Sequence, residues 1–166
     1  MEESGAPEAP GVPLLMTRVE HMFLGRYQHS LDDKGRLIVP SRYRDLLASD
    51  GAYILQGLDR NLVVVTVPGF ERFSSQVMEM SATDPTSRQL KRLIFSTAER
   101  VEVDKVGRIL IPAFLRKWAE LDSDVMIIGA GTYFEIWSLN NWVPQNALIE
   151  DADANAQRFA GWDLTF

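Results

Sequence analysis

The chain has 166 residues, of which 46% are hydrophobic, and it carries a formal net charge of −6 and no cysteine. Length and composition suit a globular protein of one compact domain or two small ones. The lack of cysteine excludes disulfide bonds, a thiolate nucleophile and a cysteine-rich zinc site, and it favours a reducing compartment. We therefore expect a cytoplasmic protein.

The composition of segment 1–21 predicts a disordered extension. This segment holds three prolines and two glycines with few large apolar side chains, a composition that does not support a packed core. An acidic, proline-rich start is unlike a secretory signal, and no apolar run is long enough to cross a bilayer. We expect a soluble protein that is not exported, with order beginning near Met22.

A β-hairpin, a short helix and two further strands are predicted next. Asp and Gly between the first two strands supply the side-chain hydrogen bond and the positive φ of a tight turn. Pro40 can start a helix without losing a needed N–H. The predicted elements are strands at 23–31 and 36–39 around a turn at 32–35, a helix at 41–47, and strands at 53–56 and 62–67.

The same pattern returns in the second half of the chain. The stretch DDKGRLIVP at 32–40 recurs as DKVGRILIP at 104–112, and the offset between them holds without a gap from Phe23/Phe95 to Gly57/Gly129. Self-similarity of this length indicates two copies of one structural unit. The second copy predicts strands at 98–103 and 108–111, a helix at 112–119, and strands at 125–128 and 133–137.

Helices are predicted between and after the copies. Segments 68–80 and 85–95 each begin with proline, Thr83 or Asp84 can cap the second of them, and a third helix is expected after Asn140. This order divides the chain into an extension (1–21), a first repeat (22–96), a second repeat (97–150) and a C-terminal tail (151–166).

Each copy is too small to bury a sufficient core alone, so we expect the two to pack together in an α+β, mainly β, fold. Pairing about a pseudo-two-fold axis would bring the two Gly-Arg turns onto one surface. The distribution of charge supports a basic centre, because residues 23–120 carry +3 while residues 1–22 carry −3 and residues 121–166 carry −6.

Basic side chains near the repeated turns indicate a DNA-binding surface, since Arg makes bidentate contacts with phosphate or guanine and Lys contacts phosphate as a point charge. A structural interpretation competes with it: Asp32 pairs with Arg36, and Asp104 with Arg108, within a stabilised hairpin that has no ligand. The candidate DNA-binding residues are Lys34, Gly35, Arg36, Arg44, Lys105, Gly107, Arg108, Arg116 and Lys117, and the candidate turn-shaping residues are Asp32 and Asp104.

The Phe23-Leu24-Gly25 start and the two Asp-x-x-x-Arg motifs, at Asp32 and Asp104, each running into Gly-Arg and three apolar residues before proline, resemble the MraZ family of bacterial transcriptional regulators. The resemblance covers about residues 22–150. More broadly, the Gly-Arg-apolar-Pro motif is similar to the swapped-hairpin DNA-binding domains of the AbrB and SpoVT class.

The resemblance implies a pseudo-two-fold double swapped-hairpin β-barrel with flanking helices. It also implies assembly into a homo-oligomeric ring and binding to repeated boxes of double-stranded DNA upstream of the division and cell-wall gene cluster, its own promoter included, hence a nucleoid-associated protein. Arg36 and Arg108 then become the main DNA contacts. A ring of weakly basic faces binds DNA by avidity despite the acidic total charge.

The chain differs from the family pattern in its extension and in its second turn, where Lys105 and Val106 replace Asp33 and Lys34 at the repeat offset. We expect the two turns to contact DNA unequally.

Two other classes of function are weighed against DNA binding. An enzyme is not expected: the chain has two histidines, no glycine-rich phosphate loop and no zinc-ligand spacing, and we expect no cofactor, metal or small-molecule substrate. A ring-forming interaction scaffold remains the alternative, with Trp118, Trp137, Trp142 and Trp162 as surface anchors or ordinary core residues.

Overall fold

A computed structural model describes residues 18–47 and 50–166, so the predicted extension falls mostly outside the described residues, and only a single 3-10 turn, Val19–His21, precedes the repeats. The first copy comprises β1 (Arg26–Ser30), β2 (Arg36–Ile38), α1 (Ser41–Leu47), β3 (Ala52–Gln56), β4 (Leu62–Thr66), α2 (Val67–Met78) and α3 (Pro85–Thr97). The second comprises β5 (Glu99–Val101), β6 (Arg108–Leu110), α4 (Ala113–Trp118), β7 (Asp124–Gly129), β8 (Tyr133–Ser138), α5 (Leu139–Glu150) and α6 (Ala152–Arg158). The predicted order of elements in each copy is confirmed.

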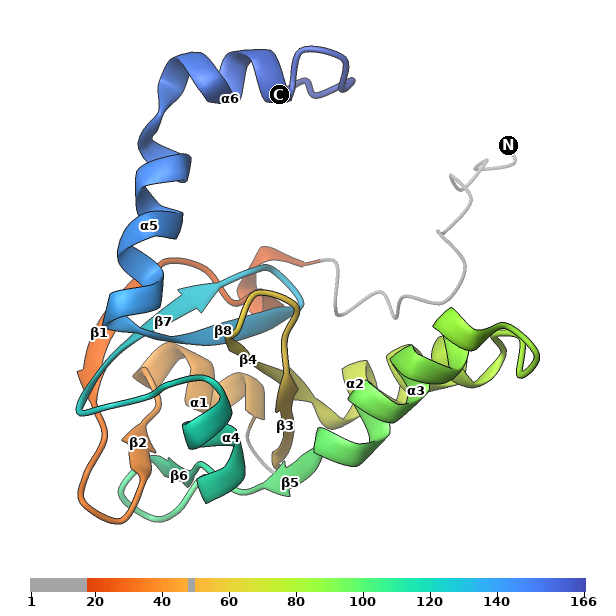
Figure 1. Ribbon diagram of the computed structural model, residues 1–166. Helices are drawn as coiled ribbons and strands as arrows, with labels where there is room; N and C mark the ends of the chain where they lie inside the picture. The colour runs from red at the N-terminus through yellow and green to blue at the C-terminus, as the bar shows by residue number, and fades with distance from the viewer. Residues whose placement is uncertain (1–17, 48–49) are drawn as a thin grey trace, which may run out of the picture.

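The strands form one six-stranded antiparallel sheet, in the order β1-β7-β8-β4-β3-β5, and a separate two-stranded ribbon of β2 and β6 (Figure 1). The two copies exchange partners, because β1 pairs with β7 and β5 pairs with β3. The expected closed barrel is wrong: β1 and β5 are the edges of the large sheet and do not meet. After β1 and after β5 the chain instead enters the ribbon, as β2 and β6. The edge strand β5 has only three residues, and a short edge strand resists pairing with a further strand.

The repeat is not free of gaps, which corrects the sequence prediction. Ile54 in β3 and Ile127 in β7 occupy matching core positions, and so do Leu62 in β4 and Phe134 in β8. The first pair is separated by one residue more than the second pair. Side chains alternate between the faces of a strand, so a shift of one residue moves the core set to the opposite face. Compared with the first copy, the second copy therefore has one extra residue before β7 and one residue fewer between the core positions of β7 and β8.

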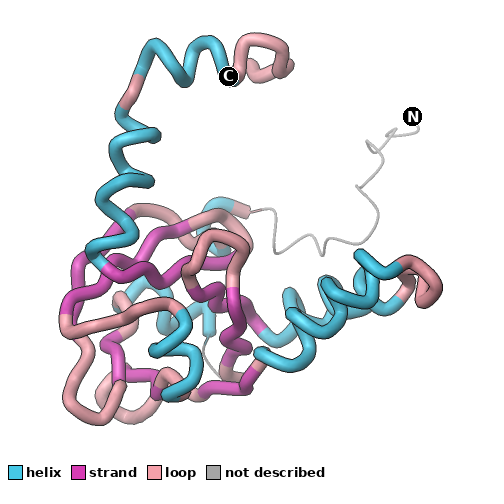
Figure 2. The backbone as a smooth tube through the Cα atoms, viewed as in Figure 1, coloured by secondary structure: helices cyan, strands magenta, loops and turns pink. Residues whose placement is uncertain are grey.

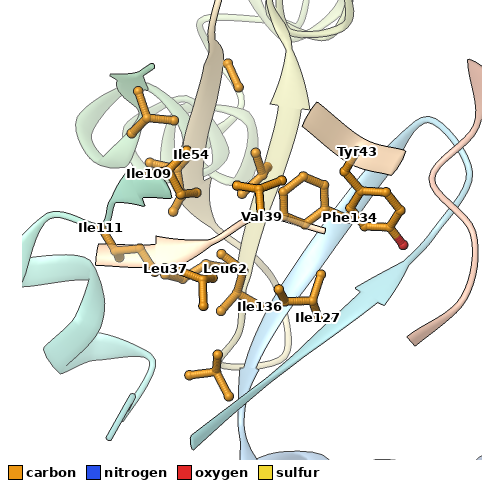
Figure 3. Close-up of a cluster of buried hydrophobic side chains, with 14 of the residues drawn as sticks. Leu37, Val39, Tyr43, Ile54, Leu62, Ile109, Ile111, Ile127, Phe134 and Ile136 are labelled. Atoms are coloured by element: carbon orange, nitrogen blue, oxygen red, sulfur yellow. The ribbon is translucent and has the colours of Figure 1, made fainter. Parts of the chain in front are cut away.

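The main core lies between the large sheet, the ribbon and the short helices α1 and α4 (Figure 3). Tyr43 on α1 is 1% exposed, and its ring contacts Phe23 edge to face with centroids 5.0 Å apart. Its hydroxyl donates a 2.7 Å hydrogen bond to the carbonyl of Leu24, and burial raises the pKa of Tyr43 to about 12. The hydroxyl thus satisfies a backbone acceptor next to the first strand.

Helices α2 and α5 occupy the same place in the two copies but have different surroundings. Thr66 caps α2 by accepting from the N–H of Gly69, and Ser138 caps α5 by accepting from the N–H of Asn141. In the first copy, α2 and α3 form a hairpin of helices. In the second copy, α5 begins against the sheet, where Trp142 packs on Met126 and Trp137, then projects from it, and α6 turns off its end without folding back (Figures 1 and 2). No helix among the described residues is both long and apolar enough to span a membrane.

Candidate nucleic-acid interface

The turn before β2 is organised by the carboxylate of Asp32. Its Oδ1 accepts from the backbone N–H groups of Lys34 (3.0 Å) and Arg36 (2.8 Å), and its Oδ2 accepts from Arg36 Nε at 2.7 Å. The N–H of Gly35 donates to the Asp32 carbonyl at 3.1 Å, with Gly35 at a φ of +81°. This positive φ is the reason for glycine here, because the backbone of other residues is strained in that region.

The turn before β6 repeats this geometry. Asp104 Oδ1 accepts from the N–H groups of Val106 (3.0 Å) and Arg108 (2.8 Å), and its Oδ2 accepts from Arg108 Nε at 2.9 Å. Gly107 has a φ of +88°. The ion pairs that the structural interpretation expected are thus present in both turns.

Hydrogen bonding keeps both carboxylates ionised. The backbone N–H of Arg36 is the main cause of a lowered pKa at Asp32, and the backbone N–H of Arg108 has the same effect on Asp104. The guanidinium groups add to this through their Nε contacts. Each arginine is therefore held against a fixed negative charge at neutral pH.

Both guanidinium groups still reach the surface. The side chains of Arg36 and Arg108 are 31% and 29% exposed. Within the described part of the chain, Arg36 uses only Nε, and Arg108 uses Nε together with a long contact from Nη1 to Asp32 Oδ2 at 3.8 Å. Nη nitrogens of both arginines thus remain available to an external acceptor.

The ribbon places the two arginines on one face. Arg36 lies opposite Leu110 and Ile38 lies opposite Arg108 in the antiparallel register, while Leu37 between them is buried. Ile38 and Leu110 are 47% and 55% exposed. The outer face of the ribbon therefore has two Arg and two apolar side chains in a two-fold arrangement.

Arg44 and Arg116 lie against the glycines of the two turns. A Cβ on Gly107 would overlap the guanidinium of Arg44, and a Cβ on Gly35 would overlap that of Arg116. Each arginine thus packs on the glycine of the other copy's turn. Arg44 Nε donates to the carbonyl of Val39 at 2.9 Å, whereas Arg116 Nε is buried and has no hydrogen-bond partner among the described residues.

Two backbone hydrogen bonds join the turns to the opposite copy. The N–H of Val39 donates to the carbonyl of Gly107 at 2.9 Å, and the N–H of Ile111 donates to the carbonyl of Gly35 at 3.0 Å. Lys34 and Lys105 are exposed at the tips, and Lys117 is exposed on α4. The structure therefore groups Lys34, Arg36, Lys105 and Arg108 around the ribbon and assigns packing contacts to Arg44 and Arg116.

Comparison with known proteins identifies the family to which this two-copy architecture belongs. A family model described as "MraZ protein, putative antitoxin-like" matches residues 22–93 and again residues 94–161. The chain belongs to the MraZ family. The starts of the two matches, at 22 and 94, have the same offset as the two turns at Asp32 and Asp104. The predicted repeat and the resemblance to MraZ are both confirmed.

Several relatives named "Transcriptional regulator MraZ" are similar over most of this chain. The one from Dictyoglomus turgidum is 48% identical over 121 residues, covering 73% of this chain and 82% of the relative. The one from Thermomicrobium roseum is 39% identical over 140 residues (84% and 98%), and the one from Roseiflexus castenholzii is 45% identical over 139 residues (84% and 94%).

The exposed apolar pair Ile38 and Leu110 of this MraZ-family chain is absent from the residues predicted to form the site. The signal was available in the strand alternation, because residues two apart on a strand share a face. Ile38 follows Arg36 by two, and Leu110 follows Arg108 by two. Both residues lie in apolar stretches before a proline, and such stretches are typical of buried strands.

Proposed function

We propose that this protein is a sequence-specific DNA-binding transcriptional regulator. The names of its relatives support this function. The observation that carries it is the two-fold face of the β2–β6 ribbon, on which Arg36 and Arg108 are each held through Nε by their own aspartate. A guanidinium whose orientation is already fixed loses less entropy when its Nη edge meets a phosphate or a guanine.

The tips of the turns supply the non-specific part of binding. Lys34 and Lys105 are exposed beside the ribbon and are suited to phosphate contacts, which position a protein on the duplex without reading its sequence. Ile38 and Leu110 can contact thymine methyl groups between the two arginines. Arg44 and Arg116, which lie against the turn glycines, and Lys117, which is exposed on α4, extend this basic surface toward the DNA backbone.

The two halves of this face are unequal. The position of Lys34 in the first turn is occupied in the second turn by Val106, which is 61% exposed. One half therefore has a cation where the other has an apolar side chain, and we propose that the two turns bind non-identical halves of one DNA box.

We further propose that each pair of exchanged strands is a swapped hairpin of the AbrB type, supported by the β1–β7 and β3–β5 pairings. The targets would be repeated boxes upstream of the division and cell-wall gene cluster, including the protein's own promoter, bound at the nucleoid in the cytoplasm. A homo-oligomeric ring would present several such faces together, and avidity raises affinity by a factor of about 10² or more when the geometry permits simultaneous contact.

A ring-forming scaffold without DNA readout is the second candidate. It is favoured by one observation: both arginines already pair with carboxylates of their own turns. The two candidates differ in what the arginines do, so the same variants test both.

Fluorescence anisotropy of the protein with DNA from upstream of its own gene, and with a scrambled duplex, separates these functions. For a regulator, affinity for the native duplex falls as salt rises, with a log–log slope of about −0.9 per phosphate contact. Replacing Arg36 and Arg108 together by alanine removes the preference, and each lost base contact costs about 1–3 kcal/mol, or about 5- to 150-fold.

Arg92→Ala, on the exposed face of α3, is the matched control and is expected to bind as the wild type does. Circular dichroism of the double variant establishes that it is folded. Equal binding of native and scrambled DNA by the wild type, or an undiminished preference in the folded double variant, would reject the proposed regulator and favour the scaffold.

A further inference from the structure

A groove lies between the α2–α3 hairpin and the adjoining face of the large sheet. Its volume is about 590 Å³, and its lining is mostly apolar, with Leu58, Val65, Phe73 and Leu90 among the lining residues. Leu58 is 82% exposed and Phe73 is 38% exposed. The groove therefore has large apolar side chains on its rim that no described part of the chain covers.

The groove also contains a cation, Arg72 on α2. Its Nη1 is buried without a hydrogen-bond partner among the described residues. A buried donor without an acceptor costs free energy. Glu135 lines the same groove, but its two oxygens already accept from Asn61 Nδ2 (2.9 Å) and Trp137 Nε1 (3.1 Å). The other carboxylate in the lining, Asp59, is on the exposed rim.

The C-terminal segment 159–166, here called the aromatic tail, has the complementary character. Phe159 is 39% exposed, Trp162 is 64% exposed and Leu164 is 71% exposed. The rings of Phe159 and Trp162 already pack against each other with centroids 5.3 Å apart. Asp163 is the single charged side chain of this segment. The aromatic tail thus offers an exposed apolar cluster with one side-chain carboxylate.

The aromatic tail lies far from the groove of its own chain, because the helices that follow the two copies run in different directions. In the first copy α3 folds back beside α2, whereas in the second copy α5 leads α6 and the tail away from the α2–α3 hairpin (Figures 1 and 2). Each chain therefore has one groove in its first copy and one distant tail in its second.

We propose that the groove binds the aromatic tail of a second copy of this chain, with Asp163 accepting from Arg72 Nη1 and Trp162 packing at the rim beside Phe73. Buried aromatic anchors are characteristic of the residues that dominate binding energy at interfaces. A contact between two different surfaces is head-to-tail, and such contacts close into rings when the rotation permits. The inference rests on the homo-oligomer proposed above and names the surfaces that build it.

Two variants and their mixture test this contact by light scattering after size exclusion. Phe73→Glu spoils the groove and Trp162→Glu spoils the tail, so each variant alone is expected to fall from the wild-type oligomer to a monomer. Mixed in equal amounts they retain one intact groove and one intact tail, and they are expected to form a heterodimer of twice the subunit mass.

Phe95→Glu is the matched control, because Phe95 is 40% exposed on α3 and is not among the residues that line the groove. It is expected to keep the wild-type mass. Leu58→Glu, at a more exposed position on the groove rim, serves as a second groove variant that leaves the fold unchanged. A monomeric wild type, a mixture without heterodimer, or a self-contact within one chain would overturn the inference.

Exchanging the charges tests the predicted ion pair. Arg72→Asp and Asp163→Arg each weaken the oligomer, with an expected loss of at least tenfold in association, and their combination in one chain restores it. Failure of the heterodimer with intact DNA binding rejects only this contact, whereas an intact oligomer without DNA preference rejects only the proposed regulator.

Discussion

Replacing Gly35 by alanine tests the contact that joins each turn to the opposite copy. Gly35 has a φ of +81°, where a side chain costs about 1–2 kcal/mol, and the new Cβ would overlap the guanidinium of Arg116. The guanidinium is the end of a flexible side chain, so moving it aside adds a small cost, about 1 kcal/mol, because Arg116 Nε is buried. We therefore expect Gly35→Ala to lower the free energy of unfolding by about 2–3 kcal/mol in total.

Gly131 supplies the control, because its φ is +87° and a Cβ there would meet nothing within 4 Å. Gly131→Ala should therefore show only the backbone cost of about 1–2 kcal/mol. Urea unfolding followed by tryptophan fluorescence, at one protein concentration and with m checked for each variant, measures the difference.

Removing the Arg116 side chain should relieve the clash in Gly35→Ala but leave the backbone strain at residue 35. In an Arg116→Ala background, Gly35→Ala is expected to cost no more than Gly131→Ala does, and this coupling is what a double-mutant cycle isolates. Equal losses at Gly35 and Gly131, or no coupling to Arg116, would refute the packing of arginine on glycine across the two copies.

The turn carboxylates, a buried tyrosine and a buried asparagine give three further predictions. The carboxyl pKa values of Asp32 and Asp104 are lowered in the folded protein. The stability that these groups contribute is therefore present above their ordinary pKa of 3.8 and is lost only as the pH falls through the lower folded values. Carbon-detected NMR titration should place both midpoints below pH 3.8. Tyr43→Phe should cost about 0.5–1.5 kcal/mol in denaturant unfolding, because the part-buried hydrogen bond from its hydroxyl to the carbonyl of Leu24 is lost. Asn61 is 1% exposed and bonded through both ends of its amide, so Asn61→Ala should cost about 1–3 kcal/mol, and a loss below about 0.5 kcal/mol would contradict these bonds.

The sequence by itself determined the repeat, the order of elements and the turns. Asp32 and Arg36 are four residues apart, and the hydrogen bonds that shape their turn run between near neighbours in the chain. Such local bonds depend on residue type and spacing, which is why the pattern at Asp104 and Arg108 reproduces the same geometry. Helix starts at proline were predictable for the same reason.

Only the tertiary structure decided how the copies meet. The open sheet, the exchange of β1 and β5 between copies and the one-residue shift before β7 depend on packing segments that lie far apart in the chain. The same is true of the contact between Arg44 and Gly107 of the other copy. Residue spacing along the chain specifies contacts within a turn, whereas contacts between distant segments are selected by the fit of whole surfaces in a dense core.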